Sequence, residues 1–198
     1  MEYRPLKNLE GKKIMLASHS PRRRELLGML GVEFSIAETI EVDESYPDTL
    51  PAESVAEYLS AKKGEAYHGT LTPDTVLITA DTVVIIDGEI LGKPDSEENA
   101  KEMLRKLSGR SHKVVTGVTV TTTRARKSFS SVTEVAFDNL SEEEISYYIE
   151  KYRPYDKAGA YGIQEWIGAV GIKGIEGSYY NVMGLPVHQL YKQLLTVE

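Results

Sequence analysis

Cysteine is absent from the 198 residues, which excludes disulfide bonds, a thiol nucleophile and cysteine metal ligands. Long apolar runs are missing too, since none approaches the roughly 20 residues that cross a bilayer. The segment 1–13 is polar and lacks the apolar core of a secretory signal, so we expect a cytoplasmic protein with no membrane partner. Basic residues are outnumbered, 23 to 30, and the net charge of −7 argues against nucleic acid as a partner.

Several common catalytic motifs are also missing. The chain has neither G-x-x-x-x-G-K-[ST] nor G-x-G-x-x-G, so a P-loop or a dinucleotide site lacks its fingerprint. No G-x-S-x-G elbow is present, and the four histidines show no H-E-x-x-H spacing. A small, highly charged anion held in one local basic pocket remains compatible with the acidic balance.

The first stretch with a chemical signature is LASHSPRRRELL, residues 16–27. The strand 14–16 leads into a helix for which Ser20 is a good N-cap and Pro21 suits the first position. Three arginines then occupy the first turn, where the helix dipole disfavours cations by roughly 0.3–1 kcal/mol each. Free backbone N–H groups, serine hydroxyls and guanidinium groups together predict a phosphate site. The alternative is a capped surface helix with solvated arginines.

Asp81 is the second candidate, because it interrupts the most apolar strand of the sequence, 75–86. A buried carboxylate is costly unless a charged or hydrogen-bonding partner receives it. On the functional interpretation, Asp81 is a general base or a metal ligand. On the structural interpretation, it accepts hydrogen bonds from backbone N–H groups at a bend in the strand. Lys93, in a Gly-Lys-Pro turn, and Glu44, in an acidic loop, are weaker candidates. The segment 156–164, with two glycines, Lys157 and Gln164, suggests backbone that approaches a ligand closely.

The alternation of elements predicts an α/β protein with a mixed sheet and helices packed on it. The predicted elements are helices at 21–31, 51–67, 98–107, 141–151 and 187–195, and strands at 34–36, 75–86, 89–91 and 114–123 with a partner strand ending near 137. The glycine- and tyrosine-rich segment from 154 to 183 is predicted as strand and turns.

Five ordered segments closely resemble the Maf family of nucleoside triphosphate pyrophosphatases, over nearly the whole chain from Ile14. They are LASHSPRRRELL (16–27), TADTVV (79–84) with LGKP (91–94), LSGRSHKVVTGV (107–118), DKAGAYGIQ (156–164) and GSYYNVMGLP (177–186).

The resemblance implies an elongated mixed sheet with flanking helices and two lobes around a deep cleft, similar to inosine triphosphatases, as a single domain over residues 1–198. Family members cleave nucleoside triphosphates between the α and β phosphates with a divalent metal, here Mg²⁺ or Mn²⁺. The sequence of residues 156–164 is similar to that of the family branch that acts on dTTP and UTP. The alternatives are a nucleotide-sensing or partner-binding regulator of septum formation and an inosine triphosphatase-like house-cleaning enzyme. Family members are often dimeric, so a homodimer is one state that the resemblance allows.

Residue roles follow from the same motif positions. The resemblance implies Asp81 as the proton acceptor, with Lys93 and Glu44 completing the catalytic set, and Glu44 and Asp81 near the metal. The positions expected to meet phosphates are Ser18, Arg23, Lys63, Lys93 and Lys157, and those that govern the base are Arg22, Thr82 and Gln164. Whether Asp81 is the metal ligand, the base or both is left open.

This chain departs from the family pattern at two places. Gly64 follows Lys63 where alanine is usual, and Glu165-Trp166 replaces the glycine that commonly follows Gln164. The second departure bears on substrate preference more than on catalysis.

Overall fold

Strand β3 (Thr75–Ile86) begins in one unit of the computed structural model and ends in the other. The structure describes residues 5–198. The first four residues of the polar segment 1–13, which is predicted not to be a secretory signal, therefore lie outside the described residues. Unit 1 comprises the described residues up to Asp81 with Thr116–Ser131 and Gly184–Glu198, and unit 2 comprises Thr82–Val115 and Val132–Met183.

The sheet is mixed, which confirms the predicted α/β class. Its order is β2-β1-β3-β5-β6-β7, with β4 paired to β3. Strand β1 runs parallel to both β2 and β3, whereas β4 on β3 and β7 on β6 are antiparallel. Besides β3, the strands are β1 (Lys13–Leu16), β2 (Ser35–Ile36), β4 (Glu89–Leu91), β5 (Ser111–Thr121), β6 (Arg126–Phe137) and β7 (Ile172–Glu176).

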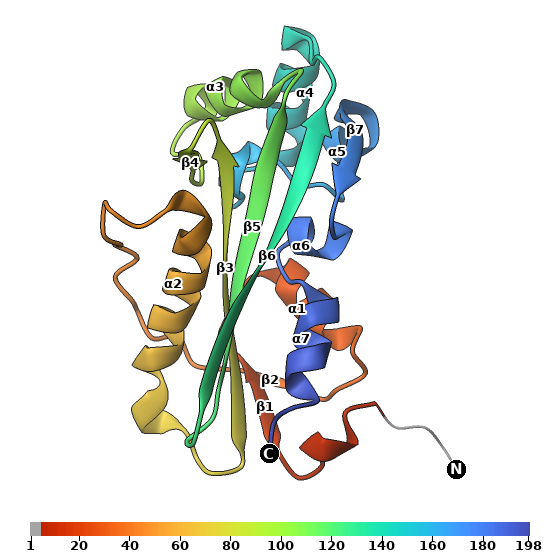
Figure 1. Cartoon of the computed structure of the whole chain (residues 1–198). Helices are drawn as coiled ribbons and strands as arrows, with labels where there is room; N and C mark the ends of the chain where they lie inside the picture. The colour runs from red at the N-terminus through yellow and green to blue at the C-terminus, as the bar shows by residue number, and fades with distance from the viewer. Residues whose placement is uncertain (1–4) are drawn as a thin grey trace. The chain divides into compact units, whose positions relative to one another are not determined.

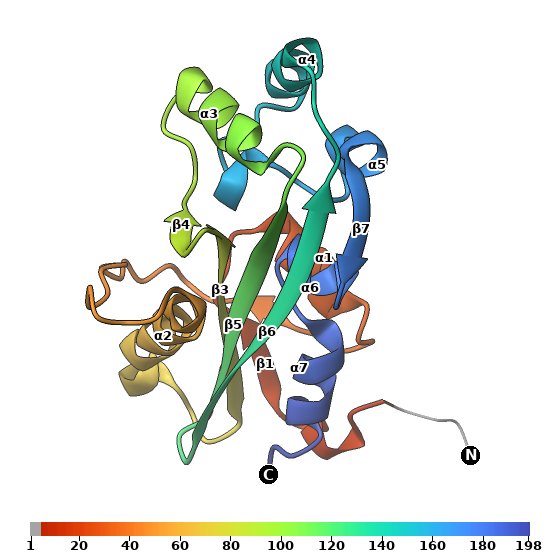
Figure 2. The same ribbon diagram turned by 45° about the horizontal axis from the view of Figure 1, so that its top comes forward.

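Unit 1 has helices on both sides of its strands. Helix α2 (Ala52–Ala66) lies on one side, and α1 (Pro21–Gly28) and α7 (Val187–Leu194) lie on the other (Figures 1 and 2). Short 3₁₀ turns occur at Lys7–Leu9 and His68–Thr70. The buried side chains of this unit include Leu16, Leu26, Leu27, Val55, Leu77 and Ile78.

Unit 2 carries the remaining helices. Helix α3 (Glu97–Leu107) is capped by Ser96, and α4 (Glu142–Tyr152) begins with a complete capping box from Ser141. Arg105 of α3 donates to Glu142 of α4, so the two helices lie side by side. After a 3₁₀ turn at Ala158–Ala160 come α5 (Trp166–Gly171), β7 and α6 (Tyr179–Met183).

Most predicted elements are confirmed, within a few residues at their ends. The exception is the segment from 154 to 183, predicted as strand and turns: it contains β7 but also the short helices α5 and α6. Its glycines hid the helical pattern because glycine lowers helix propensity. Gly168 is nevertheless required, since a Cβ there would lie 1.8 Å from the carbonyl oxygen of Ile163. No helix within residues 5–198 has both the length and the apolar character to cross a membrane.

Candidate functional site

The turn between β1 and α1 forms as predicted. The Ser20 hydroxyl oxygen accepts from the backbone N–H of Arg23 at 3.4 Å, and Pro21 occupies the first helical position. The Ser18 hydroxyl oxygen accepts from the backbone N–H of Ser20 at 3.3 Å. Two serines therefore shape the turn that presents the arginines.

Arg23 joins this turn to the neighbouring strand. Its Nε donates to the carbonyl oxygen of Gly184 at 2.9 Å, and its Nη1 donates to the carbonyl oxygen of Ala80 at 2.9 Å and to Ser18 Oγ at 3.5 Å. Burial lowers the pKa of Arg23, while the charges of Asp81 and Glu44 raise it and that of Arg22 lowers it. A guanidinium remains protonated under such a shift, so Arg23 is a fixed positive charge beside Asp81.

The third arginine of the turn plays a smaller part. Arg24 is exposed, and its Nη2 donates to the carbonyl oxygen of His19 at 3.4 Å. Its neighbours Arg22 and Arg23 are both half-buried.

The carboxylates of Asp81 and Glu44, two of the predicted site residues, both contact the ammonium group of Lys63. The ammonium Nζ of Lys63, in α2, lies 2.5 Å from Asp81 Oδ1 and 2.8 Å from Glu44 Oε1. The exposed fractions of these side chains are 19% for Lys63, 15% for Asp81 and 60% for Glu44. The cost of burying Asp81 is thus offset by a cation in direct contact.

A second lysine of α2 holds the acidic loop in place. Lys62 donates to the Ser45 carbonyl oxygen at 2.9 Å and lies 3.3 Å from Asp43 Oδ2. Asp43 in turn accepts from the Ser45 backbone N–H at 3.0 Å. Successive lysines therefore tie the loop that carries Glu44 to the same helix.

Gly64, the first departure from the family pattern, sits where α2 touches the sheet. A Cβ at this position would lie 2.9 Å from Thr121 Oγ1 and 3.3 Å from Thr79 Oγ1. Thr79 donates to the carbonyl oxygen of Ser60 at 2.7 Å, which joins β3 to α2 two residues before Asp81. The glycine therefore permits the close approach that brings Lys63 to Asp81.

The donor set fits a magnesium-like cation that also binds substrate. Asp81 and Glu44 converge on one point, and Mg²⁺ is commonly held by one or two carboxylates together with substrate phosphates. Within residues 5–198 there is no cluster of three or more His, Cys, Asp or Glu that could hold a metal by itself.

In unit 2, Lys157 is held by two carboxylates. Its Nζ lies 2.7 Å from Asp156 Oδ1 and 3.1 Å from Glu165 Oε1, and its side chain is only 9% exposed. Glu165 also accepts from the hydroxyl of Tyr148, which itself accepts from the backbone N–H of Gly162 at 3.0 Å. Burial and the neighbouring Glu165 raise the pKa of Tyr148, so it stays a donor. Glu165, the second departure from the family pattern, therefore braces the segment 156–164 from its far end.

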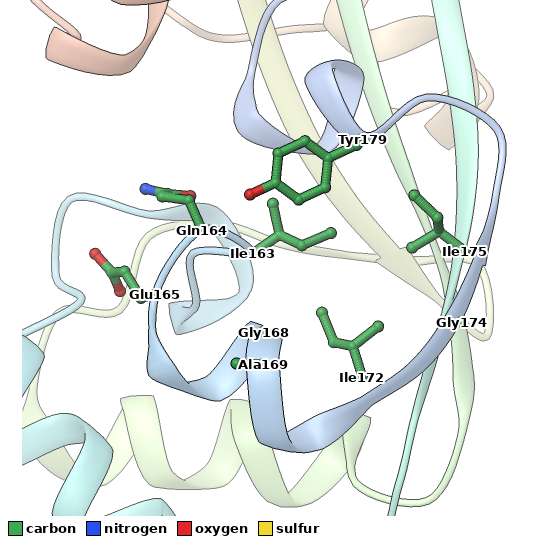
Figure 3. A pocket seen from close by; sticks show the side chains of 9 residues that line it. All are labelled: Ile163, Gln164, Glu165, Gly168, Ala169, Ile172, Gly174, Ile175 and Tyr179. Carbon is green, nitrogen blue, oxygen red and sulfur yellow. The ribbon is translucent and has the colours of Figure 1, made fainter.

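Gln164 borders a pocket of about 420 Å³. Figure 3 shows Ile163, Ile172 and Tyr179 directed into this space, while the side chains of Gln164 and Glu165 point away from it. Gln164 is an exposed residue, and its side-chain amide does not point toward the apolar residues that line the pocket (Figure 3).

Thr82 and Lys93 are the remaining predicted residues. Thr82 follows Asp81 in β3 and is half-buried, and Lys93 is exposed in the turn after β4. The backbone N–H of Gly159 donates to the carbonyl oxygen of Gly92 at 3.0 Å, which ties the Lys93 turn to the 156–164 segment.

The structure thus sorts the predicted residues into two groups. Ser18, Arg22, Arg23, Glu44, Lys63 and Asp81 belong to unit 1, and Thr82, Lys93, Lys157 and Gln164 belong to unit 2. Prediction from sequence missed Tyr148, which lies in a helix with no motif of its own. In the fifth motif, Asn181 is buried and donates to the Val114 carbonyl oxygen at 3.1 Å and to Thr133 Oγ1 at 2.9 Å.

The mixed sheet makes this an α/β protein. Its two convergent carboxylates lie beside arginine and lysine, and such a site suits a polyanion together with a cation. The chain belongs to the Maf family, since residues 13–197 match the family model described as Maf-like protein.

Two similar proteins are both called dTTP/UTP pyrophosphatase. The one from Phocaeicola vulgatus is 56% identical over 96% of this chain and 98% of its own. The one from Porphyromonas gingivalis is 56% identical over 96% of each chain. A solved structure of a HAM1 protein from Coxiella burnetii is 16% identical, with a TM-score of 0.48 over 94% of this chain and 100% of that one.

Proposed function

We propose that this chain is a nucleoside triphosphate pyrophosphatase that hydrolyses dTTP and UTP to the monophosphate and pyrophosphate. The observation that carries the proposal is the convergence of Asp81 and Glu44 on Lys63, beside the fixed charge of Arg23. The names of relatives that are 56% identical over nearly their full length support the substrate.

The reaction places specific demands on these residues. Water attacks the α-phosphorus, the bond from that phosphorus to the bridging oxygen breaks, and pyrophosphate leaves with its electron pair. Asp81 orients the water and takes its proton. A bound Mg²⁺ or Mn²⁺, held by Asp81 and Glu44, would stabilise charge that develops on the phosphate oxygens.

The phosphates require local cations, because the protein as a whole is acidic. We propose that Arg23, Lys63 and the start of α1, with Ser18, meet the phosphates in unit 1. In unit 2, Lys93 and Lys157 keep the phosphate role that the motif resemblance implies. For Lys157 this role requires the ammonium to leave Asp156 or Glu165 at least in part.

The base is the other part of the substrate. We propose that Arg22, Thr82 and Gln164 discriminate among bases. The exposed amide of Gln164 can both donate and accept, as a pyrimidine edge requires. The proposal extends to a cytoplasmic location and to residues 1–198 acting as one domain, and a homodimer is one state that the family resemblance allows.

The decisive experiment is a panel of nucleoside triphosphates with Mg²⁺ or Mn²⁺, scored for pyrophosphate release. We expect dTTP and UTP to be cleaved in preference to ITP and to purine nucleotides. Preference for ITP would favour an inosine triphosphatase-like enzyme. Nucleotide binding without any pyrophosphate release would favour a regulator and contradict the proposal.

A further inference from the structure

The ammonium of Lys63 lies at the point where Asp81 and Glu44 converge. We infer that Lys63 is a built-in placeholder for the divalent cation: it occupies the space between the two carboxylates in the nucleotide-free protein and must leave before an ion can bridge them. This inference rests on the proposed function, because it assigns Asp81 and Glu44 to the metal.

The distances argue that the ammonium and the ion exclude each other. Lys63 Nζ lies 2.5 Å from Asp81 Oδ1 and 2.8 Å from Glu44 Oε1. A magnesium ion would need its oxygen ligands at about 2.0–2.1 Å, so an ion held by these two carboxylates would compete with the ammonium for the same space. Both cannot be held at once by the same pair of oxygens.

The charges explain why a placeholder is useful. Two carboxylates that face one point repel each other unless a cation lies between them. Lys63 neutralises one of the two charges, and it keeps Glu44 on its loop directed toward Asp81. The pair of ligands is thereby preorganised before any ion arrives.

The side chain is able to leave while its helix stays in place. Helix α2 is packed closely against the sheet, since a Cβ at Gly64 or Gly117 would already overlap its neighbours. The lysine side chain itself has a flexible four-carbon stem, and Glu44 is 60% exposed at the other side of the contact. The negative phosphates of a nucleotide offer the displaced ammonium a new partner, which accounts for the phosphate role proposed for Lys63.

The consequence is that metal and nucleotide bind together. In the absence of nucleotide, Lys63 competes with the ion and keeps its affinity low. With nucleotide present, Lys63 moves to a phosphate and that competition ends.

The test is Mn²⁺ binding to the full-length, nucleotide-free protein, measured from the electron paramagnetic resonance signal of free Mn²⁺. We expect K63Q and K63M to bind Mn²⁺ at least tenfold tighter than the wild type. K63R keeps the cation and should bind like the wild type. K62Q is the matched control, because Lys62 is the preceding residue and also ties the acidic loop to α2, but through Ser45 and Asp43.

Two results overturn the inference: K63Q and K63M within twofold of the wild type, or equal tightening in K62Q. Should the neutral variants fail to fold, the ¹⁵N-labelled lysine ammonium signal of Lys63 in the wild type, assigned by its loss in K63R, gives the same answer. We expect Mg²⁺ alone to shift it, and an unchanged signal at saturating Mg²⁺ overturns the inference.

These readings do not depend on turnover. A wild type that hydrolyses dTTP while K63Q binds Mn²⁺ no tighter overturns only the placeholder. A wild type that is inert on every nucleotide of the panel overturns the proposed function, whatever the Mn²⁺ data show.

Discussion

At the scale of single residues, Asp81 shows how a carboxylate is accommodated inside an apolar strand. Its neighbours Val83 and Val84 are buried, and its own side chain is 15% exposed. Removing one partner of a buried ion pair leaves the other charge uncompensated, which costs more than the pair contributes. The position therefore tolerates an acid only because Lys63 and Arg23 are beside it.

Asp81→Asn tests the catalytic role directly. We expect the turnover of dTTP to fall at least about 100-fold, the range for a lost general base, because the amide cannot take the proton of water. The affinity for a non-hydrolysable dTTP analogue should change little, because Arg23 and the start of α1 remain. Pyrophosphate release and analogue binding by calorimetry measure the two quantities.

Asp87→Asn is the control for this change. Asp87 is an exposed residue in the turn after the same strand, with φ 53°, a conformation that asparagine also adopts readily. We expect normal turnover. If Asp81→Asn kept more than a tenth of wild-type turnover, Asp81 would have no part in proton transfer.

His112 is a buried residue with a pH-dependent effect on stability. Its Nε2 lies 2.7 Å from the hydroxyl of Tyr161, and within residues 5–198 its Nδ1 has no hydrogen-bond partner. Burial lowers the pKa of His112 from 6.5 to about 4. Between these two values the unfolded chain binds a proton that the folded chain does not.

Stability should therefore be full above pH 6.5 and fall as the pH drops from 6.5 toward 4. The loss from this one group is on the order of 3 kcal/mol. Urea unfolding at pH 7.5 and pH 4.5 measures it: His112→Phe, which keeps an aromatic ring beside Phe137, should lose less stability on acidification than the wild type. His68→Asn, at an exposed histidine, should behave like the wild type, and equal pH dependence in all three proteins would contradict the prediction.

At the scale of elements, α2 is the helix that builds the site. It carries Lys62 and Lys63, which hold the acidic loop, and Gly64, which touches the sheet. Gly117 of β5 lies under the same helix: a Cβ there would be 2.2 Å from the backbone nitrogen of Glu57 and 2.3 Å from the carbonyl oxygen of Ala56. Helix and strand meet backbone to backbone at this point.

Gly117→Ala should therefore push α2 away from the sheet. We expect a loss of about 1–3 kcal/mol in the free energy of unfolding, the usual cost of overpacking. Turnover should fall as well, because the shift moves Lys63 relative to Asp81. The matched control is Gly174→Ala in β7, where a Cβ meets nothing within 4 Å. Equal urea midpoints for the two variants would show that the contact is not tight.

At the scale of the whole molecule, the distribution of charged residues favours a small polyanion over a large one such as duplex DNA. The chain has 30 acidic and 23 basic residues, yet Arg22, Arg23 and Lys63 belong to one small region. A duplex presents a charge about every 1.7 Å and needs an extended basic surface. A triphosphate needs only a few local cations.

We therefore expect no binding to duplex DNA at about 0.1 M salt, near-physiological screening. Fluorescence anisotropy of a labelled 20-mer measures it, with a fluorescent dTTP analogue as the positive control. DNA binding in the low micromolar range would contradict the interpretation of the charge.

Much of the fold follows from local chemistry and could be predicted. Ser20, Ser96 and Ser141 cap their helices because a hydroxyl reaches an N–H only three residues away. Asp87-Gly88 makes a hairpin turn because both residues adopt positive φ. The short helices α5 and α6 could not be predicted, because packing rather than propensity stabilises them.

The sequence by itself determined the family, the serine- and arginine-bearing turn before α1 and the unusual carboxylate in β3, since each is written in contiguous residues. Only the tertiary structure decided which charges meet. Lys63 reaches Asp81 and Glu44, Arg23 reaches the carbonyl oxygens of Ala80 and Gly184, and Glu165 holds Lys157. The physical reason is range: caps and turns are set over a few residues, whereas these contacts depend on how closely helices and strands from distant parts of the chain pack.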